Sequence, residues 1–374
     1  KVTLLDLRGE RERAIEGFQR LSRRYPDMEE SYVALADLYS SAREYDSAIE
    51  TVDLALTNIG RKDHLLLKKA QLLLARKDIK PLETLLKETI GVNESNVEAH
   101  LLLRDWYVEG KDWDKAYEIQ RWIVKHMKAE EEEQRFAGIR YEKIKAASEK
   151  GGAGDIAAIV KELKEIVSEE KRFIPAYILL GHLYRKTGSL NEAARIYGRG
   201  YTKTGHIVFL TEMEELYIDR RDPGVILKIY RRILDVSPKN YVILFLYARL
   251  CLRLEMIDEA IETLNTLFAE GQSFSGLHRA MAEAYIHHCE LAEAVDEFKK
   301  AFPMEKAYIP FRCDTCQASY EQWVPFCESC NSWGTVNVKT EEFLPVETAE
   351  LRVLYEREGF GGQMNYEEDE GVSV

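Results

Sequence analysis

The sequence predicts an all-α fold, a superhelical solenoid of short helical repeats, with a small four-cysteine β module near its C-terminal end. Three observations support this prediction. Small and aromatic residues recur every 33 or 34 residues along most of the 374-residue chain. The composition is that of an ordered, helical protein, with 45% hydrophobic residues, 31% charged residues and only 9 prolines. Four of the six cysteines fall within residues 313–330.

The repeat is defined by an aromatic or apolar residue followed nine positions later by a small or apolar one. The pairs are Tyr39 with Ala48, Leu73 with Leu82, Tyr107 with Ala116, Tyr184 with Ala193, Tyr217 with Ile226, Cys251 with Ala260, and Tyr285 with Ala294. Three positions before the first member, five repeats carry Gly or Ala, which we name the crossing site: Ala36, Ala70, Gly181, Ala248 and Ala282. Small residues there let two antiparallel helices approach closely, and the pattern is typical of the tetratricopeptide repeat.

The repeats are predicted to occupy residues 1–308. Their register places them at 29–62, 63–96, 97–130, 174–206, 207–240, 241–274 and 275–308. The interval 131–173 breaks the period, and we expect a degenerate repeat there with a longer loop at 151–154. We therefore expect about eight to nine repeats, the first of them cut at residue 1, in a protein that continues upstream.

The first helix of each repeat is expected to line a groove that binds partners, because solenoids use this face for recognition. The predicted groove residues are Arg185, Lys186, Phe245, Arg249, Arg253 and Arg279. Clustered arginines suit a partner that carries carboxylates or phosphates. An ordinary solvated face would show the same residues, so the sequence leaves both interpretations open.

Residues 309–340 are predicted to form a separate metal-binding ribbon. Cys313 and Cys316 make one C-x2-C pair, and Cys327 and Cys330 make the second. Two such pairs on facing hairpins can hold one tetrahedral metal ion through four thiolates. So small a module has little core, so the metal would supply most of its folding free energy. Disulfides are disfavoured because no secretory signal is visible, and we expect one structural zinc ion rather than iron.

The repeats followed by FRCDTCQASYEQWVPFCESCNSWGTV resemble the bacterial lipopolysaccharide assembly protein B family. The specific match covers this stretch: Phe311 precedes the first cysteine pair, Trp323 lies between the pairs, and Ser332, Trp333 and Thr335 follow the second. The resemblance implies repeats joined to a rubredoxin-like metal domain that packs against them and is required for function. It also implies an N-terminal membrane helix, missing from this sequence, and a position on the cytoplasmic face of the inner membrane.

The same resemblance implies an adaptor function. Its protein partners would be a membrane-bound ATP-dependent protease and enzymes of lipid A synthesis, with lipopolysaccharide as a further candidate ligand. The adaptor would control turnover of the deacetylase that commits to lipid A synthesis. Trp323 and Trp333 are expected to serve the packing or the partner surface of the ribbon.

Two features depart from the pattern of that family. The cysteine turns read CDTCQ and CESCN, without the Pro and Gly of typical rubredoxin turns, which argues against iron redox chemistry. The chain also continues as an acidic extension, 341–374, with ten acidic and two basic residues. Its stretch AELRVLYEREGF could form a short helix that docks back on the solenoid, whereas the last ten residues have the composition of a disordered tail. The extension could equally be a solvated segment.

We predict that the chain is not an enzyme. It contains no nucleophile elbow, no G-x-x-x-x-G-K-[ST] phosphate loop and no cluster of histidines with carboxylates. The ribbon alone also resembles that of a bacterial DNA-repair ATPase, but that activity needs the missing phosphate loop. A net charge of −13 gives no general attraction for nucleic acid. The alternatives are a rubredoxin-type electron-transfer protein and a generic tetratricopeptide chaperone or assembly scaffold with unrelated partners.

Overall fold

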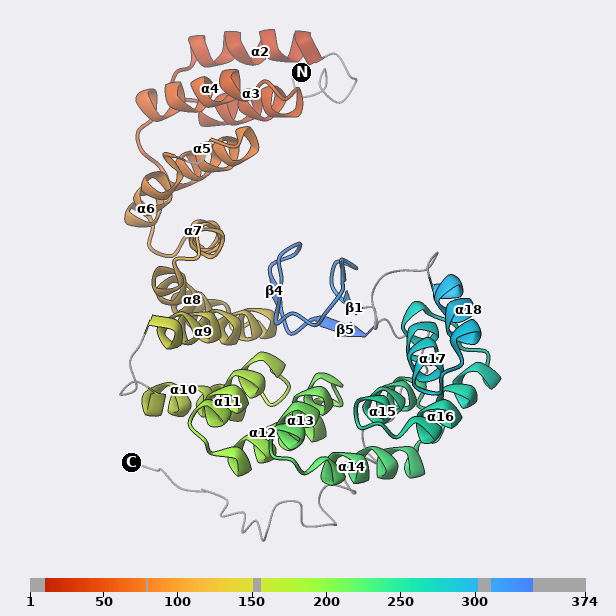
Figure 1. Cartoon of the computed structure of the whole chain (residues 1–374). Coiled ribbons are helices and arrows are strands. Elements are labelled where there is room, and N and C mark those ends of the chain that lie inside the picture. Colours follow the sequence, from red (N-terminus) through yellow and green to blue (C-terminus); the bar gives the residue numbers. More distant parts are fainter. Residues whose placement is uncertain (1–10, 79, 151–155, 302–310, 339–374) are drawn as a thin grey trace. The chain divides into compact units, whose positions relative to one another are not determined.

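The computed structural model describes residues 11–78, 80–150, 156–301 and 311–338 (Figure 1). Within these ranges the chain forms 17 helices, α2 to α18, and five short strands, β1 to β5. The chain divides into two compact units, Lys1–Lys143 and Ile144–Val374. Among the described helices, none combines the length and the apolar character needed to cross a membrane.

The first unit is a stack of helix pairs. Its helices are α2 (Arg11–Arg24), α3 (Glu29–Ser41), α4 (Tyr45–Asn58), α5 (Asp63–Arg76), α6 (Leu82–Val92), α7 (Val97–Glu109), α8 (Trp113–Met127) and the first part of α9 (Glu130–Lys150). The pairs α3–α4, α5–α6 and α7–α8 match the three repeats predicted between residues 29 and 130.

The second unit contains the rest of the helices and all five strands. They are α10 (Ile156–Glu169), α11 (Ile174–Lys186), α12 (Leu190–Thr204), α13 (Val208–Asp219), α14 (Pro223–Val236), α15 (Tyr241–Arg253), α16 (Ile257–Ala269), α17 (Ser275–His287), α18 (Leu291–Ala301), β1 (Phe311–Cys313), β2 (Ser319–Tyr320), β3 (Phe326–Cys327), β4 (Ser332–Trp333) and β5 (Val336–Val338). The four repeats predicted from residue 174 onward are confirmed as the pairs α11–α12 to α17–α18. Helices α9 and α10 fill the irregular interval, and the loop expected at 151–154 lies outside the described residues.

The turn inside each repeat explains why the aromatic position recurs. After Tyr39 the chain reaches Arg43, which has a left-handed φ of 62°, and the N–H of Glu44 then donates to the Tyr39 carbonyl at 2.9 Å. This hydrogen bond is the helix-ending arrangement known as the Schellman motif. The same left-handed turn residue recurs at Lys77, Lys111, Gly188, Arg221, Glu255 and Cys289. Each repeat therefore ends its first helix at the same point of the sequence period.

The crossing site shows how closely the two helices of a repeat pack. A Cβ atom added to Gly181 would lie 2.1 Å from Cε1 of Tyr197, so α11 and α12 touch with no room for a side chain. Ala36, Ala70, Ala248 and Ala282 are all fully buried. Tyr197 follows Gly181 by 16 positions, and this spacing pairs the crossing site with the second helix of the same repeat.

Two repeats place a charged residue at the crossing site instead. Arg104 in α7 and Glu214 in α13 have relative exposures of 2% and 0%. Arg104 donates to Oε1 of Gln120 at 2.8 Å, and Gln120 is also 16 positions later. Buried charges are costly unless hydrogen-bonded, so these two side chains need dedicated partners.

Candidate metal centre and interaction surface

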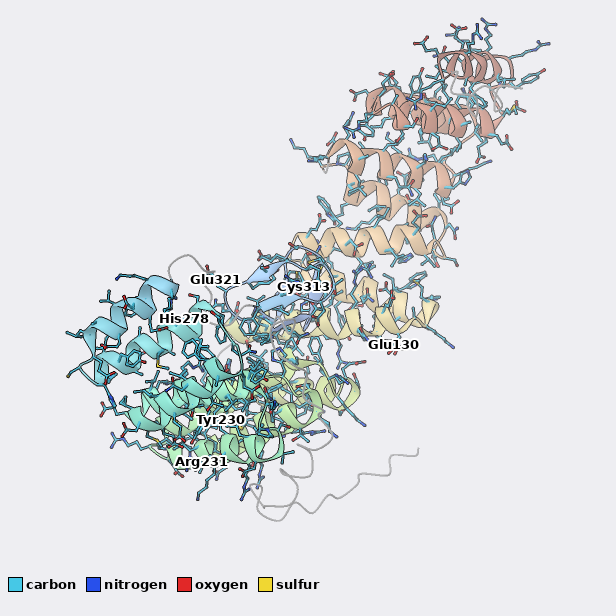
Figure 2. All side chains as sticks on the ribbon, turned by 90° about the vertical axis from the view of Figure 1, so that its right-hand side faces the viewer. Glu130, Tyr230, Arg231, His278, Cys313 and Glu321 are labelled. Atoms are coloured by element: carbon cyan, nitrogen blue, oxygen red, sulfur yellow. The ribbon has the colours of Figure 1, made fainter. Side chains whose placement is uncertain are left out.

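The strand module consists of two small antiparallel sheets that present two turns. Strand β1 lies between β2 and β5, with Phe311 opposite both Tyr320 and Val338, and β3 pairs with β4. The first cysteine pair starts in β1 and continues into the turn before β2. The second pair starts in β3 and continues into the turn before β4. Figure 2 marks Cys313 in this module.

The four sulfur atoms form one cluster. The Sγ atoms of Cys313, Cys316, Cys327 and Cys330 all lie within 4.8 Å of one another. Two of the distances, Cys313 to Cys330 and Cys316 to Cys327, are 3.6 Å, and none of the four thiols forms a disulfide. A tetrahedral ion with metal–sulfur bonds of about 2.3 Å would set its sulfurs about 3.8 Å apart. The cluster therefore has the donor set and the spacing of a four-thiolate metal site.

The cysteine turns keep the left-handed conformation that glycine usually supplies. Gln317 and Asn331, each directly after the second cysteine of its pair, have φ values of 64° and 54°. This conformation is costly for residues with a Cβ, although Asn tolerates it better than most. The absence of glycine from these two positions therefore does not change the turn, so it is no argument against iron.

Hydrogen bonds around the cluster favour thiolates at two positions. Burial raises the pKa of the Cys313 thiol, but the Thr335 hydroxyl and the backbone N–H groups of Cys316 and Thr315 outweigh burial and bring it to about 6. Burial likewise opposes ionisation of Cys327, yet the Tyr320 hydroxyl, 3.0 Å from its sulfur, helps to lower the pKa.

The pKa of the Cys330 thiol shows why a cation fits the cluster. Burial, together with the neighbouring thiols, raises the pKa of Cys330 to about 12. Four thiolates at this spacing repel one another unless a positive charge lies between them. A metal ion supplies that charge and removes the proton from a coordinating thiol. The residues present thus fit one metal ion.

The ribbon packs against the repeats of the second unit at His206, in the turn between α12 and α13. The Nδ1 atom of His206 accepts the backbone N–H of Val208 at 3.2 Å, so Nε2 carries the proton and donates it to the Val336 carbonyl at 3.2 Å. The His206 ring also meets Trp323 edge-on, with ring centroids 6.0 Å apart. Burial lowers the pKa of His206 to about 4, so the ring is neutral at pH 7.

The two tryptophans predicted for the ribbon have different surroundings. Trp323 is half-buried and belongs to the ribbon core that surrounds Cys313 and Cys327. Its contact with His206 makes it a packing residue between ribbon and repeats. Trp333 is also half-buried, and its ring packs on Phe326 across the β3–β4 pair with centroids 4.9 Å apart.

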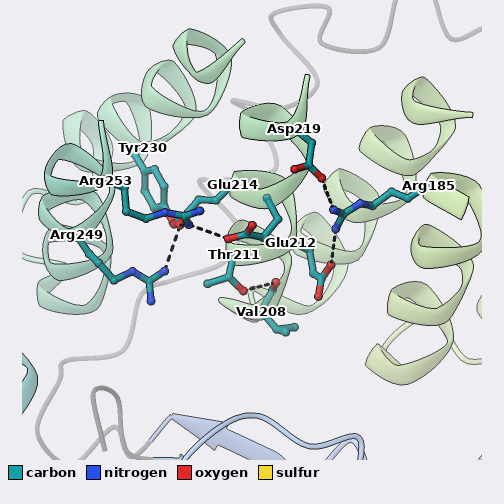
Figure 3. A network of polar contacts seen from close by, with 10 residues as sticks. Arg185, Val208, Thr211, Glu212, Glu214, Asp219, Tyr230, Arg249 and Arg253 are labelled. Carbon is teal, nitrogen blue, oxygen red and sulfur yellow. Dashed lines mark hydrogen bonds and ion pairs between the residues drawn. The ribbon is translucent and has the colours of Figure 1, made fainter. Parts of the chain in front are cut away.

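Three of the predicted groove residues, Arg185, Arg249 and Arg253, pair with carboxylates on α13 (Figure 3). Arg185 lies 2.7 Å from the Asp219 carboxylate and 3.6 Å from that of Glu212. Arg185 belongs to α11, the first helix of the preceding repeat. The first helices of neighbouring repeats are thus joined by ion pairs between residues about 30 positions apart.

Glu214 is the centre of the second group. Its carboxylate accepts a hydrogen bond from the Tyr230 hydroxyl and lies 3.2 Å from Arg249 and 3.4 Å from Arg253. Burial raises the pKa of Glu214, while the two arginines and the tyrosine oppose that rise. Arg253 also pairs with Glu215 at 2.8 Å. Tyr230 follows Glu214 by 16 positions, the spacing already seen for Gly181 and Tyr197.

These contacts correct two expectations about the groove. Phe245 does not line a surface: it is fully buried and its ring packs edge-on against Phe274 at 5.0 Å. The face is also not simply basic, because Arg185, Arg249 and Arg253 meet four carboxylates of α13. Of the remaining two residues, Lys186 is exposed and Arg279 is half-buried.

Comparison with known proteins supports the repeat assignment. The family model described as "Tetratricopeptide repeat" matches residues 217–283, and a second model of the same description matches 174–201. The matched segments of this chain are therefore tetratricopeptide repeats. No curated protein matches the chain.

Several solved structures are similar at low identity. YrrB, described as a tetratricopeptide protein with an unusual peptide-binding site, is 15% identical, with 47% of this chain and 86% of that one covered and a TM-score of 0.34. A tetratricopeptide protein from Parabacteroides merdae is 14% identical over 65% and 93% of the two chains, with a TM-score of 0.34. The C-terminal part of one from Cytophaga hutchinsonii is 12% identical over 64% and 95%, with a TM-score of 0.38.

Two residues with important contacts in the second unit, Glu214 and His206, were not predicted from the sequence. Glu214 could have been found, because it occupies the crossing site 34 positions before Ala248, where the repeat normally has Gly or Ala. A charged residue at such a site signals a buried polar contact. His206 gave no comparable signal, since it lies in a turn and its partners are 117 or more positions away in the ribbon.

Proposed function

We propose that this chain is a non-enzymatic adaptor of bacterial lipopolysaccharide assembly. Its repeats would bind protein partners, namely a membrane ATP-dependent protease and enzymes of lipid A synthesis, with lipopolysaccharide as a further ligand. The observation that carries the proposal is the four-thiol cluster, built on a strand module that packs against tetratricopeptide repeats through His206. Repeats of this type are a protein-interaction fold, which supports the scaffold part of the proposal.

The proposed location is the cytoplasmic face of the inner membrane. It rests on the resemblance of the ribbon motif, which carries with it a membrane helix before the first repeat. Neither the cysteines nor the repeats need an oxidising compartment. In a reducing compartment the four thiols do not form disulfides, so they stay available to a metal.

The first-helix face of α11, α13 and α15 is the proposed partner surface. Its arginines are already paired with α13 carboxylates, so it offers both signs of charge at close spacing. A partner segment with alternating charges can exchange these pairs, whereas a purely acidic segment would meet the carboxylates as well. The partner is therefore expected to present mixed charges rather than a single carboxylate or phosphate.

The proposal is tested by capture from bacterial membranes. The bait is the full chain with the proposed N-terminal membrane helix attached, as wild type, as Cys327→Ser/Cys330→Ser, and as the control Cys289→Ser, which removes an exposed thiol outside the ribbon. We expect wild type and the control to retain the protease and the lipid A enzymes, and the double variant to lose them. Absence of these proteins from all three samples would contradict the adaptor function.

Metal content separates the adaptor from the electron-transfer alternative. The purified chain should contain about one zinc ion and show no visible colour, as expected for a structural four-thiolate site. Stoichiometric iron with a red colour and a reversible one-electron couple would instead support the rubredoxin-type carrier. Loss of the metal is expected to unfold the ribbon while the repeats keep their helical circular dichroism.

A further inference from the structure

A serine, a histidine and a glutamate form a hydrogen-bonded row where α17 packs on α18. His278, in the first turn of α17, is labelled in Figure 2. Its Nε2 atom lies 3.0 Å from Oγ of Ser273, and its Nδ1 atom lies 2.5 Å from a carboxylate oxygen of Glu297 in α18. All three residues belong to the described part of the second unit, whereas the extension at 341–374, with its expected short helix, lies outside the described residues.

The two contacts of His278 fix the direction of each hydrogen bond. Burial raises the pKa of Glu297, but hydrogen bonds from His278 and Lys300 outweigh burial and lower it, so the group is a carboxylate. A carboxylate only accepts hydrogen bonds, so in the neutral imidazole Nδ1 carries the hydrogen and donates it to Glu297. The lone pair of Nε2 therefore faces Ser273 and accepts its hydroxyl hydrogen.

Burial decreases along the row toward the serine. Glu297 and His278 have relative exposures of 9% and 6%, whereas Ser273 is exposed. The ring of Phe268 in α16 packs on His278, with ring centroids 5.2 Å apart, and helps to hold its orientation. The base and its carboxylate are thus held inside the protein, while the hydroxyl is open to a reagent from solution.

Three other histidines in the described ranges contact carboxylates, and all three are exposed. They are His64, His182 and His288, which pair with Glu29, Glu212 and Asp258. Exposed pairs of this kind contribute little free energy. Burying a histidine with a carboxylate is costly unless the hydrogen bonds of both groups are made, and burial therefore sets His278 apart from the other three.

We propose that Ser273 is a nucleophilic serine, with His278 as its general base and Glu297 as the residue that positions the base. Ser273 reacts with activated acyl compounds and becomes covalently modified. A serine hydroxyl is a weak nucleophile by itself, and a hydrogen-bonded histidine oriented by a carboxylate is the arrangement that activates it. This modification site goes beyond the adaptor function and does not depend on it.

The step is a substitution at the acyl carbon of an activated ester. Nε2 of His278 takes the hydroxyl proton as Oγ of Ser273 forms a bond to the carbonyl carbon. The bond from that carbon to the leaving alcohol oxygen then breaks, and the leaving oxygen takes the proton from Nε2. The products are an acyl-serine ester and a free alcohol, with no oxidation or reduction. Helix α17 starts two positions after Ser273, and the N–H groups of its first turn favour the negative charge that develops on the carbonyl oxygen.

The proposal is tested on the full chain with a fluorophosphonate, which modifies activated serines by a similar substitution. Oγ binds the phosphorus atom, fluoride leaves, and mass spectrometry locates the adduct. Ser189 is the internal control, because it is also exposed but its hydroxyl contacts Thr187 instead of a histidine. We expect Ser273 to be modified at least about a hundredfold faster than Ser189, within the range that a general base contributes. Equal rates at the two serines would overturn the proposal, and this comparison needs no variant.

Two variants separate the roles of His278 and Glu297. His278→Gln keeps a side chain that forms hydrogen bonds but is not a base, so it should slow modification of Ser273 to the rate of Ser189. Glu297→Gln should slow the reaction and also lower the pH at which its rate is half-maximal, because a neutral amide no longer stabilises the protonated ring.

Circular dichroism of each variant reports whether the repeats remain folded. A folded His278→Gln protein that is modified at Ser273 as fast as wild type would overturn the assignment of the base. A slower reaction in Glu297→Gln without a change in the half-maximal pH would overturn the positioning role of Glu297, since a purely structural contact affects the rate alone.

Discussion

Arg104 and Glu214 are exceptions to the small residue expected at the crossing site, yet their helices still pair as in the other repeats. Each puts a charge where the helices cross, and each finds a polar partner 16 positions later, Gln120 or Tyr230. Each also bonds to a residue of the following helical hairpin: Arg104 to Glu132 at 2.6 Å, and Glu214 to Arg249. A buried charge of this kind connects neighbouring repeats, because its hydrogen-bonding capacity exceeds what one partner can satisfy.

Replacing Glu214 with alanine should destabilise the second unit, although alanine is the usual residue at this site. The Tyr230 hydroxyl would be left buried without its acceptor, and Arg249 and Arg253 would lose a buried counter-charge. We expect a loss of about 3 kcal/mol in the free energy of unfolding. Urea unfolding followed by circular dichroism measures it.

A second change should restore much of that stability. Glu214→Ala/Tyr230→Leu reproduces the Ala248 and Leu264 pair of the next repeat, so no polar atom remains unpaired between the helices. The control Glu215→Ala removes a half-exposed carboxylate and should cost less than about 1 kcal/mol. A double variant no more stable than Glu214→Ala would show that the repeat equivalence does not hold here.

At the scale of helices, the sequence predicted the seven regular repeats because their constraints are local. The Schellman turn after each aromatic site and the small crossing site both act within about 20 residues, so they leave a period that can be read directly. The cysteine spacing was equally direct, since two C-x2-C pairs specify a complete set of four metal ligands by their spacing alone.

The predictions that were wrong concerned the groove: on which face of its helix a side chain lies, and which residues it contacts. Phe245 belongs to a helix that is buried on most sides, and periodicity alone could not separate its core and groove faces. The charge of the groove was misjudged because the carboxylates of α13 come from a neighbouring repeat. Such a contact depends on how neighbouring repeats stack, because the two paired residues lie more than 30 positions apart in the sequence.

The contact of Gly181 with Tyr197 gives a test at the scale of one helix pair. Gly181→Ala should destabilise by about 2–3 kcal/mol, because its Cβ would overlap the Tyr197 ring and push α11 from α12. Gly224→Ala in α14 is the control, since the nearest atom to a Cβ there is 3.8 Å away. That change should be neutral or stabilise by up to about 1 kcal/mol, as alanine favours helix. Equal effects of the two changes in thermal unfolding would contradict the close contact.

At the scale of the second unit, His206 makes the attachment of the ribbon depend on pH. Its pKa is lowered by burial from 6.5 to about 4, so the neutral ring is the form that stabilises the folded state. Between these values the unfolded chain binds the additional proton. The contribution is therefore complete above pH 6.5 and is lost as the pH falls toward 4, amounting at most to about 3 kcal/mol.

This prediction is measured as the difference in unfolding free energy between wild type and His206→Gln. Glutamine can still donate to the Val336 carbonyl but does not titrate, and both proteins share the same metal site, so acid effects on the thiols cancel. The advantage of wild type should shrink steadily from pH 7 to pH 4.5. A difference that stays constant over this range would exclude His206 as the source.

The distribution of the six cysteines has a practical consequence for labelling. Four of them meet at the metal site, and Cys251 is buried in α15, where burial raises its pKa to about 11. Cys289, exposed at the left-handed turn between α17 and α18, remains. A maleimide dye added to the folded, metal-loaded protein would therefore attach at one position, Cys289, next to α18. Any dye in excess of one per chain then reports thiols released from the metal site.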